Sequence, residues 1–405
     1  MRVLKLMART TVLGCAVSMI PAAAFAGGWS TEGIASYDLL FAEERFGFEF
    51  QSTYGFRNVD FKNASTTQSS IFGSYPLPGE DGADDIAADL WIGSAAVKMG
   101  LTDNLDFFAR VSEPFEVREA PGFDWNGQYA IGETIGDTLS VEGMLSYRHE
   151  VSDGRFFRVF GGVRTMQMDF SQQAALYGTL AAPTLATSSD LAFGYRIGAA
   201  FEVPEIALRA LVSYESAVDL DMEGALTDQG FLFTNAVAET TLPQSFEVKV
   251  QSGVAPGWLV SLGVKWTDWS VMQEASANLI GGEGALIPVL DGSTTRDLSY
   301  SDGWIVEAGV GHQLTDKLAL GSSVIWDKGI GGPYSDYYAF TLGGAYDLGE
   351  HVTLSLGGTA IYKTADEGNY NVAIDLGGGP SVTNTDYEYD SSWNFALSSK
   401  LRFTF

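Results

Sequence analysis

Cysteine is almost absent from this chain, and basic residues are scarce. The 405 residues include one cysteine, Cys15, and 23 Lys and Arg against 51 Asp and Glu. A single cysteine excludes an internal disulfide and a cysteine-ligated metal. The formal net charge of -28 argues against a nucleic-acid partner, because contacts to phosphates need a basic face. The chain has 47 glycines and only 18% charged residues, which is typical of neither a disordered chain nor a coiled coil.

Long apolar runs are also missing beyond the N-terminus. Basic residues precede an apolar run at 12–20, and Ala24, Phe25 and Ala26 form a small-residue site before Gly27. This pattern predicts a secretory signal peptide at 1–26. A lipoprotein signal ending at Cys15 is the alternative, which the short apolar run before it disfavours. No later stretch reaches the ~18 apolar residues of a membrane helix. An exported chain of this kind is either soluble or a β-barrel.

Alternating apolar and polar residues decide between these two classes. From 393 to 405 the odd positions are mostly apolar and the even positions are mostly polar or small. Lipid-facing strands alternate in this way, because every second side chain faces hydrocarbon. Fourteen segments show the pattern: 46–56, 89–101, 106–116, 137–150, 155–170, 191–201, 206–220, 243–251, 258–273, 301–312, 317–328, 337–347, 351–363 and 391–405.

The connections between these segments alternate between short and long. Short turns such as 151–154 and 255–257 carry Asp-Gly or Pro-Gly, whereas segments such as 57–88 and 364–390 are long. Outer-membrane barrels have this asymmetry, with their short turns in the periplasm. We therefore predict an all-β protein, a 14-stranded antiparallel transmembrane β-barrel at 46–405 in the outer membrane of a Gram-negative bacterium. Residues 27–45 are expected to form a short plug segment. A soluble β-sandwich is the alternative.

The alternation also assigns residues to the lumen. In the segment 155–170 the odd positions face outward, which leaves an inward stripe of apolar residues and two arginines. A general porin would have a more polar interior, so this stripe favours a hydrophobic ligand, and the arginines suit an anionic head group. The predicted lumen ligand-binding residues are Phe108, Arg110, Arg158, Phe160, Arg164, Met166, Met168, Arg196 and Arg209. A second interpretation stays open, in which inward arginines and glutamates lock the barrel through ion pairs.

Two of the long connections contain apolar residues that are unexpected in loops. These residues are Leu176, Tyr177, Leu180, Phe231, Leu232 and Phe233. They are predicted to form an extracellular capture patch for hydrophobic ligands, or else to pack together at the loop tips. The long loops are strongly acidic, which would repel a free carboxylate.

Several segments resemble the FadL/TodX family of outer-membrane long-chain fatty acid and hydrocarbon transporters. They are FEVPEIALR at 201–209, LPQS at 242–245 with GVAP at 253–256, and VKWTDWS at 264–270. The resemblance implies a 14-stranded barrel, passive uptake, and lateral exit at a kinked third strand. Pro114 lies in the third predicted strand and is the expected lateral gate. The N-terminal segment is shorter than the family's usual hatch and lacks its Asn-Pro-Ala motif, so the resemblance leaves the gating open.

The expected function is passive outer-membrane transport of long-chain fatty acids or similar hydrophobic molecules by a monomer surrounded by outer-membrane lipid. The alternatives are a general porin and an outer-membrane enzyme. His149, His312 and His351 all lie beside predicted periplasmic turns, which excludes a serine-histidine triad on the outer side. The sequence has no P-loop, Rossmann or zinc motif, so no catalytic residue, cofactor or metal site is expected.

Overall fold

The structure, a computed structural model, describes residues 28–179, 181–281, 291–375 and 379–405. The predicted signal peptide and Leu180 lie outside the described residues. Among the described residues, no helix is long and apolar enough to cross a membrane. In the described ranges the helical elements are four short 3-10 helices: η1 (Asp38–Phe41), η2 (Asn126–Tyr129), η3 (Pro204–Ile206) and η4 (Trp269–Val271).

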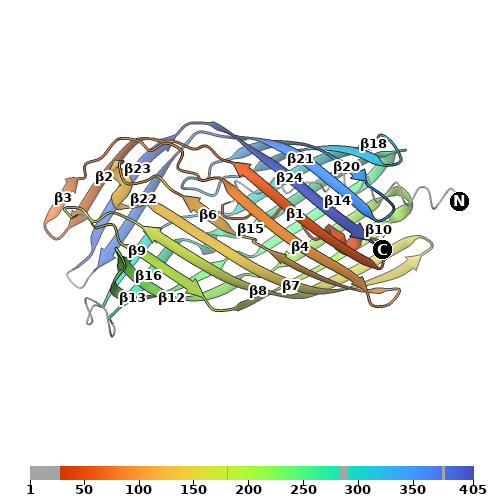
Figure 1. Ribbon diagram of the computed structural model, residues 1–405, viewed down its shortest axis with the longest axis horizontal. Helices are drawn as coiled ribbons and strands as arrows, with labels where there is room; N and C mark the ends of the chain where they lie inside the picture. Colours follow the sequence, from red (N-terminus) through yellow and green to blue (C-terminus); the bar gives the residue numbers. More distant parts are fainter. Residues whose placement is uncertain (1–27, 180, 282–290, 376–378) are drawn as a thin grey trace.

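Fourteen antiparallel strands form a closed ring, which confirms the predicted barrel (Figure 1). The ring closes where the last strand pairs with the first, with Phe403 opposite Phe48. In ring order the strands are β1 (Phe46–Phe56), β4 (Leu90–Gly100), β5 (Leu105–Ser112), β7 (Glu133–Ser152), β8 (Arg155–Gln173), β10 (Ala192–Val203), β11 (Leu208–Glu215), β14 (Ser245–Ala255), β15 (Trp258–Thr267), β18 (Gly303–Gln313), β19 (Leu318–Asp327), β20 (Tyr337–Asp347), β21 (Val352–Lys363) and β24 (Ser392–Thr404).

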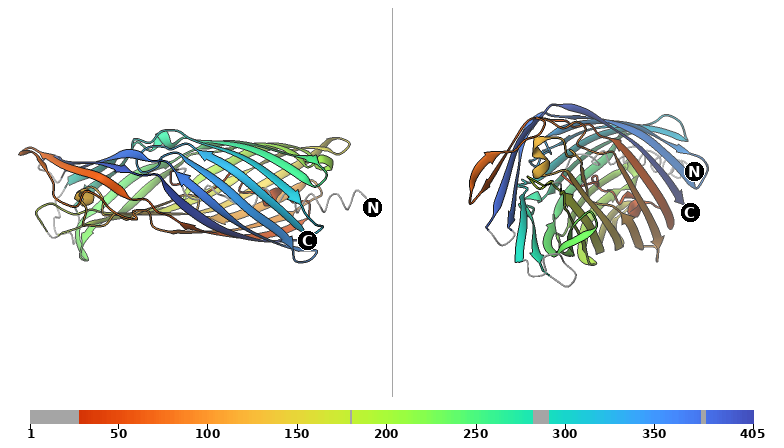
Figure 2. Two further views of the ribbon diagram at one scale, coloured as in Figure 1. Left: turned by 90° about the horizontal axis from the view of Figure 1, so that it is seen from above. Right: turned by 60° about the vertical axis from the view of Figure 1, so that its left-hand side comes forward.

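The long connections are more regular than the sequence suggested, because most of them form strands. We call these strands the extension: β2 (Phe61–Ser70), β3 (Gly73–Pro76), β6 (Glu116–Glu119), β9 (Thr184–Ser189), β12 (Val218–Asp228), β13 (Phe231–Leu242), β16 (Glu274–Ile280), β17 (Asp291–Asp297), β22 (Asp366–Asp375) and β23 (Ser381–Tyr389). They lengthen the barrel wall at the end opposite the C-terminus (Figures 1 and 2). Pairing runs without a break from β7 through β8, β9, β12, β13, β16, β17, β22, β23 and β2 to β3.

The face of the wall that carries the apolar residues differs between the ring and the extension. In the ring, outward residues of β8 such as Val159 and Val163 are apolar and exposed, as lipid contact requires. In the first half of β12, the outward positions are Asp219, Asp221 and Glu223, while the inward positions Val218, Leu220 and Met222 are apolar and buried. The extension therefore encloses an apolar interior with a water-compatible outer face. The alternation in the sequence does not predict these strands as part of the wall, because their apolar residues face inward and not toward lipid.

Candidate functional site: an apolar cavity above a closed base

The extension encloses a cavity of about 430 Å³. Its wall consists mainly of inward side chains from β8, β9, β12, β13, β16, β17 and β22, together with Trp29 from the N-terminal segment. Most of these side chains are apolar, including Met168, Phe170, Met222 and Leu279. The volume lies within the range of small-molecule sites, which are typically concave and lined by hydrophobic side chains with few polar groups.

The predicted capture patch lies at the rim of this cavity. Strand β9 pairs with β12, which brings the connection after β8 next to the β12–β13 hairpin. Leu176 and Phe233 line the cavity itself. Phe231 is exposed, and Tyr177 packs against Tyr75 and Tyr129, with ring centroids 5.7 Å apart in both pairs. Leu232 is half-buried. The patch therefore divides into residues that line the cavity and residues outside it, and its role in capture stays a prediction.

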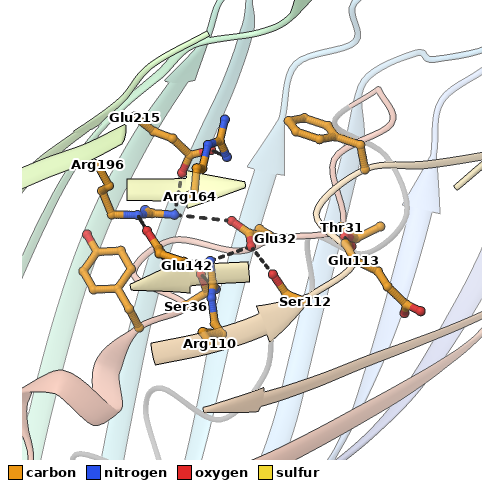
Figure 3. Close-up of polar contacts among 12 residues, drawn as sticks. Thr31, Glu32, Ser36, Arg110, Ser112, Glu113, Glu142, Arg164, Arg196 and Glu215 are labelled. Carbon is orange, nitrogen blue, oxygen red and sulfur yellow. Dashed lines mark hydrogen bonds and ion pairs between the residues drawn. The ribbon is translucent and has the colours of Figure 1, made fainter. Parts of the chain in front are cut away.

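Below the cavity, an ion-pair network joins the N-terminal segment to the barrel wall (Figure 3). Glu32 lies 2.7 Å from Arg110 and 3.6 Å from Arg196. Arg196 also contacts Glu142 at 2.7 Å and Glu215 at 2.5 Å. Arg110 reaches Glu142 at 3.2 Å, and Arg164 bonds Glu215.

We call these six residues the base network, namely Arg110, Arg164, Arg196, Glu32, Glu142 and Glu215. They are all buried. Three positive and three negative side chains give a formal charge of zero. The six side chains therefore compensate one another's charge, while the buried Lys265 nearby adds a positive charge that acts on Glu32 and Glu215.

A second layer of ion pairs lies nearer the C-terminal end of the barrel. Arg158 contacts Glu202 at 2.7 Å and Asp106 at 3.0 Å. Arg209 contacts Asp38 of η1 at 3.4 Å, and its guanidinium carbon lies 4.1 Å from the centroid of the Phe41 ring.

Apolar packing completes the base. Tyr37, Leu39, Leu40 and Phe41 are buried in one cluster with wall residues that include Phe108 and Phe160. The Tyr37 and Phe160 ring centroids are 5.5 Å apart. The N-terminal segment thus fills the lumen below the cavity with both apolar and charged contacts.

Of the nine predicted lumen residues, Met168 alone is among the described residues that line the cavity. Met166 is buried in the neighbouring apolar cluster, and Phe108 and Phe160 pack against the N-terminal segment. The arginines at 110, 158, 164, 196 and 209 all contact carboxylates. This arrangement favours the structural interpretation of the arginines. Their contact with ligand stays a prediction.

Arg296 of β17 is a cavity residue that sequence analysis did not select. It is buried, and its guanidinium bonds Glu119 at 3.0 Å and Thr134 at 3.1 Å. Glu119 also accepts hydrogen bonds from Tyr334 at 3.1 Å and Tyr370 at 3.3 Å. The sequence does contain a signal that could have identified Arg296. The long acidic connections contain few basic residues, and Arg296 is one of them.

The protonation of this cluster follows from its burial. Burial, and then the negative charge of Glu119, raise the pKa of Tyr334 and of Tyr370 well above the ordinary value, so both hydroxyls remain donors. Burial alone would lower the pKa of Arg296, but Glu119 and the nearby tyrosines outweigh it and raise that pKa. Arg57 and the buried Lys363 also act on Glu119 electrostatically, so Arg296 is one of three basic side chains around this carboxylate.

The third strand of the ring is broken where Pro114 lies. Pairing of β5 with β7 ends at Ser112 opposite Ser140, and β6 resumes with Glu116 opposite Asp137. Three residues thus face two, which is a β-bulge. On the other side, β4 pairs with β5 only as far as Ser94, although β4 itself extends to Leu90.

The N-terminal segment pairs with this broken strand. Thr31 N donates to Pro114 O at 3.0 Å, and Glu116 N donates to Trp29 O at 2.7 Å. Across the unpaired stretch of β4, Gly93 N donates to the Glu113 carboxylate at 3.0 Å. A side chain and the N-terminal segment thus replace the backbone ladder between the second and third strands of the ring. The assignment of Pro114 as a lateral gate stays a prediction.

Trp29 separates two cavities. A smaller, more polar cavity of about 40 Å³ lies behind the unpaired stretch and is lined by Leu90, Ala87 and Glu116 among others. Trp29 lines both this cavity and the apolar one. The preceding residue must be glycine, since Gly28 has a φ of 65° and a Cβ there would lie 2.5 Å from Ile330 Cδ1.

A closed barrel with a filled base and an apolar cavity at one end defines a class, that of outer-membrane barrels for hydrophobic ligands. The family model described as outer membrane protein transport protein (OMPP1/FadL/TodX) matches residues 44–403. The chain therefore belongs to the FadL/TodX family, as the sequence segments predicted.

Three known proteins illustrate this similarity. A long-chain fatty acid transport protein of Salmonella typhi is 20% identical over 339 residues, which are 71% of this chain and 73% of that protein. The crystal structure of a Pseudomonas aeruginosa FadL homologue superposes with a TM-score of 0.70 at 14% identity, covering 97% and 98% of the two chains. The toluene transporter TodX of P. putida superposes with a TM-score of 0.56 at 11% identity, covering 91% and 92%. The structural matches establish the shared fold.

Proposed function

We propose that this protein transports hydrophobic molecules passively across the outer membrane of a Gram-negative bacterium. The observation that carries the proposal is the apolar cavity above a base of buried ion pairs. A water-filled porin would need a continuous polar channel, whereas here the N-terminal segment occupies the lumen below the cavity. Long-chain fatty acids and aromatic hydrocarbons are the candidate substrates, since relatives are described as transporters of one or the other.

The route in this proposal is lateral. A ligand enters at the rim beside Phe233, occupies the apolar cavity, passes Trp29, and leaves through the unpaired stretch beside β4. Two features support this route, namely the filled base, which obstructs an axial path, and the bulge with Pro114, which interrupts the wall. The outward residue next to the interruption is the exposed Trp91, which suits a position in lipid.

The function can be tested by uptake in a deletion strain complemented with the gene. Growth on oleate and growth on toluene, each as the sole carbon source, identify the substrate group. Wild-type growth of the deletion strain on both, together with unchanged uptake of labelled substrate, contradicts the proposal. Ion conductance typical of a porin in planar bilayers would favour the porin alternative.

The route can be tested by filling the small cavity. Ala87 is buried and lines that cavity. Ala87→Phe is expected to reduce uptake strongly while ligand binding in the apolar cavity persists. Ala109→Phe adds the same bulk on a side of β5 that is not buried and serves as the matched control. Normal uptake by the Ala87→Phe variant excludes this route.

A further inference from the structure

Methionines gather around the apolar cavity. Six of the nine methionines of the chain lie in the described ranges, and Met168, Met222 and Met272 line the cavity. Met166 is buried in the same apolar cluster as these three. Met168 belongs to β8, Met222 belongs to β12, and Met272 directly follows η4. Three separate parts of the wall thus each contribute one methionine to the cavity.

These methionines are the most adaptable of the long apolar side chains in the wall. Methionine is unbranched and has three rotatable bonds, so it fills spaces of irregular shape. The neighbouring lining residues include the short side chains of Ala238 and Ala275, and the cavity itself is about 430 Å³. Trp29, by contrast, is held through its backbone, since its carbonyl accepts a hydrogen bond from Glu116 N at 2.7 Å. The methionines therefore have both the flexibility and the adjoining space to repack around a ligand.

The cavity has little polar surface with which to orient a ligand. Its surface is almost entirely apolar, and the charged residues among the described lining residues are Arg296 and Glu239. Arg296 is bonded to Glu119 and Thr134, and Glu239 is exposed. Small-molecule sites usually obtain their specificity from a few precisely placed polar groups. Selectivity in this cavity therefore depends mainly on the shape of its apolar wall.

We propose that Met168, Met222 and Met272 adapt the cavity to hydrophobic molecules of different shape, so that rigid ring compounds and flexible chains bind with similar affinity. Methionine-rich surfaces bind diverse partners because they repack around each one. A flexible chain bends to fit a fixed wall, whereas a rigid ring requires a wall that moves. The three methionines therefore determine the affinity for rigid ligands in particular. This inference specifies the substrate class and rests on the proposed transport function.

The test compares three hydrocarbons with the same number of carbon atoms on the protein in lipid nanodiscs. Dodecane is a flexible chain, biphenyl consists of two aromatic rings, and bicyclohexyl consists of two saturated rings. Each competes with a fluorescent hydrophobic probe, and empty nanodiscs correct for partition into lipid. We expect the three corrected dissociation constants of the wild type to agree within about tenfold.

Variants assign this breadth to the methionines. Met168→Leu/Met222→Leu/Met272→Leu nearly conserves side-chain volume but makes the wall stiffer. It should weaken the binding of biphenyl and of bicyclohexyl about tenfold and that of dodecane less than about threefold. Near-normal dodecane binding also shows that the variant is folded. Met144→Leu is the matched control, because Met144 is buried in the base and is not among the described lining residues; it should bind all three ligands as the wild type does.

The outcomes separate this inference from the function on which it rests. Unchanged binding of both ring compounds by the triple variant overturns the inference. Equal losses of all three ligands also overturn it, because the methionines would then support the cavity rather than adapt it. A wild-type preference of more than about a hundredfold for one ligand, or loss of the ring compounds in Met144→Leu, overturns it as well. Each of these results leaves a hydrophobic-ligand transporter intact, whereas failure of all three ligands to displace the probe from the wild type overturns both.

Discussion

The base network makes a quantitative prediction for Glu32. This carboxylate belongs to the N-terminal segment, is 8% exposed, and contacts Arg110 at 2.7 Å, Arg196 at 3.6 Å and Ser112 Oγ at 3.3 Å. Glu32→Gln preserves the shape of the side chain but changes the formal charge of the network from zero to +1. Removing one partner from a buried ion-pair network costs roughly 3–5 kcal/mol.

The substitution weakens the docking of the N-terminal segment in the lumen, because Glu32 is the residue of that segment that belongs to the network. A loss of 3–5 kcal/mol corresponds to an increase of about 100- to 5,000-fold in the undocked population. Hydrogen–deuterium exchange with mass spectrometry measures this population through the amides of residues 28–44. Exchange there should accelerate by a comparable factor, while exchange in the ring strands stays at the wild-type rate.

Glu133→Gln is the matched control, because Glu133 is an exposed glutamate on β7. It should leave exchange of the N-terminal segment unchanged. Wild-type exchange in Glu32→Gln would refute the argument that the ion pairs hold the segment in the lumen. Accelerated exchange across the whole barrel would show instead that the network stabilises the wall.

Three further predictions concern the wall and the cavity. Arg164→Met leaves Glu215 with one arginine fewer, so it should lower the free energy of unfolding by roughly 3–5 kcal/mol in a denaturant titration. It should leave dodecane binding unchanged. Lost binding without lost stability would support the prediction that Arg164 binds ligand. Phe233→Asp puts a charge in the cavity wall and should abolish binding of a fluorescent hydrophobic probe. Phe231→Asp, at an exposed position, should reduce that binding little. Equal effects of the two variants would argue against this cavity as the binding site. Trp29→Ala should join the two cavities and speed ligand release, measured as probe dissociation in stopped flow, and an unchanged rate would contradict a barrier at Trp29.

The sequence by itself determined the barrel, because lipid and lumen impose opposite requirements on alternate residues. The period of two is local, so strands such as β1 and β20 were predicted with their exact bounds. The outward and inward sides of β8 were also assigned correctly from this pattern. Family segments such as FEVPEIALR at 201–209 led to the family independently of the strand count.

Only the tertiary structure decided which charges are free and where the cavity lies. Arg158 and Arg164 were correctly expected to face the lumen, but their carboxylate partners come from other strands that are distant in sequence. The extension was missed because its apolar residues face inward, away from water rather than toward lipid. Arg296 and Trp29 lie far apart along the chain and meet at one cavity only because the extension and the N-terminal segment converge on the same lumen. Burial and charge compensation depend on such contacts between distant segments, which residue periodicity does not encode.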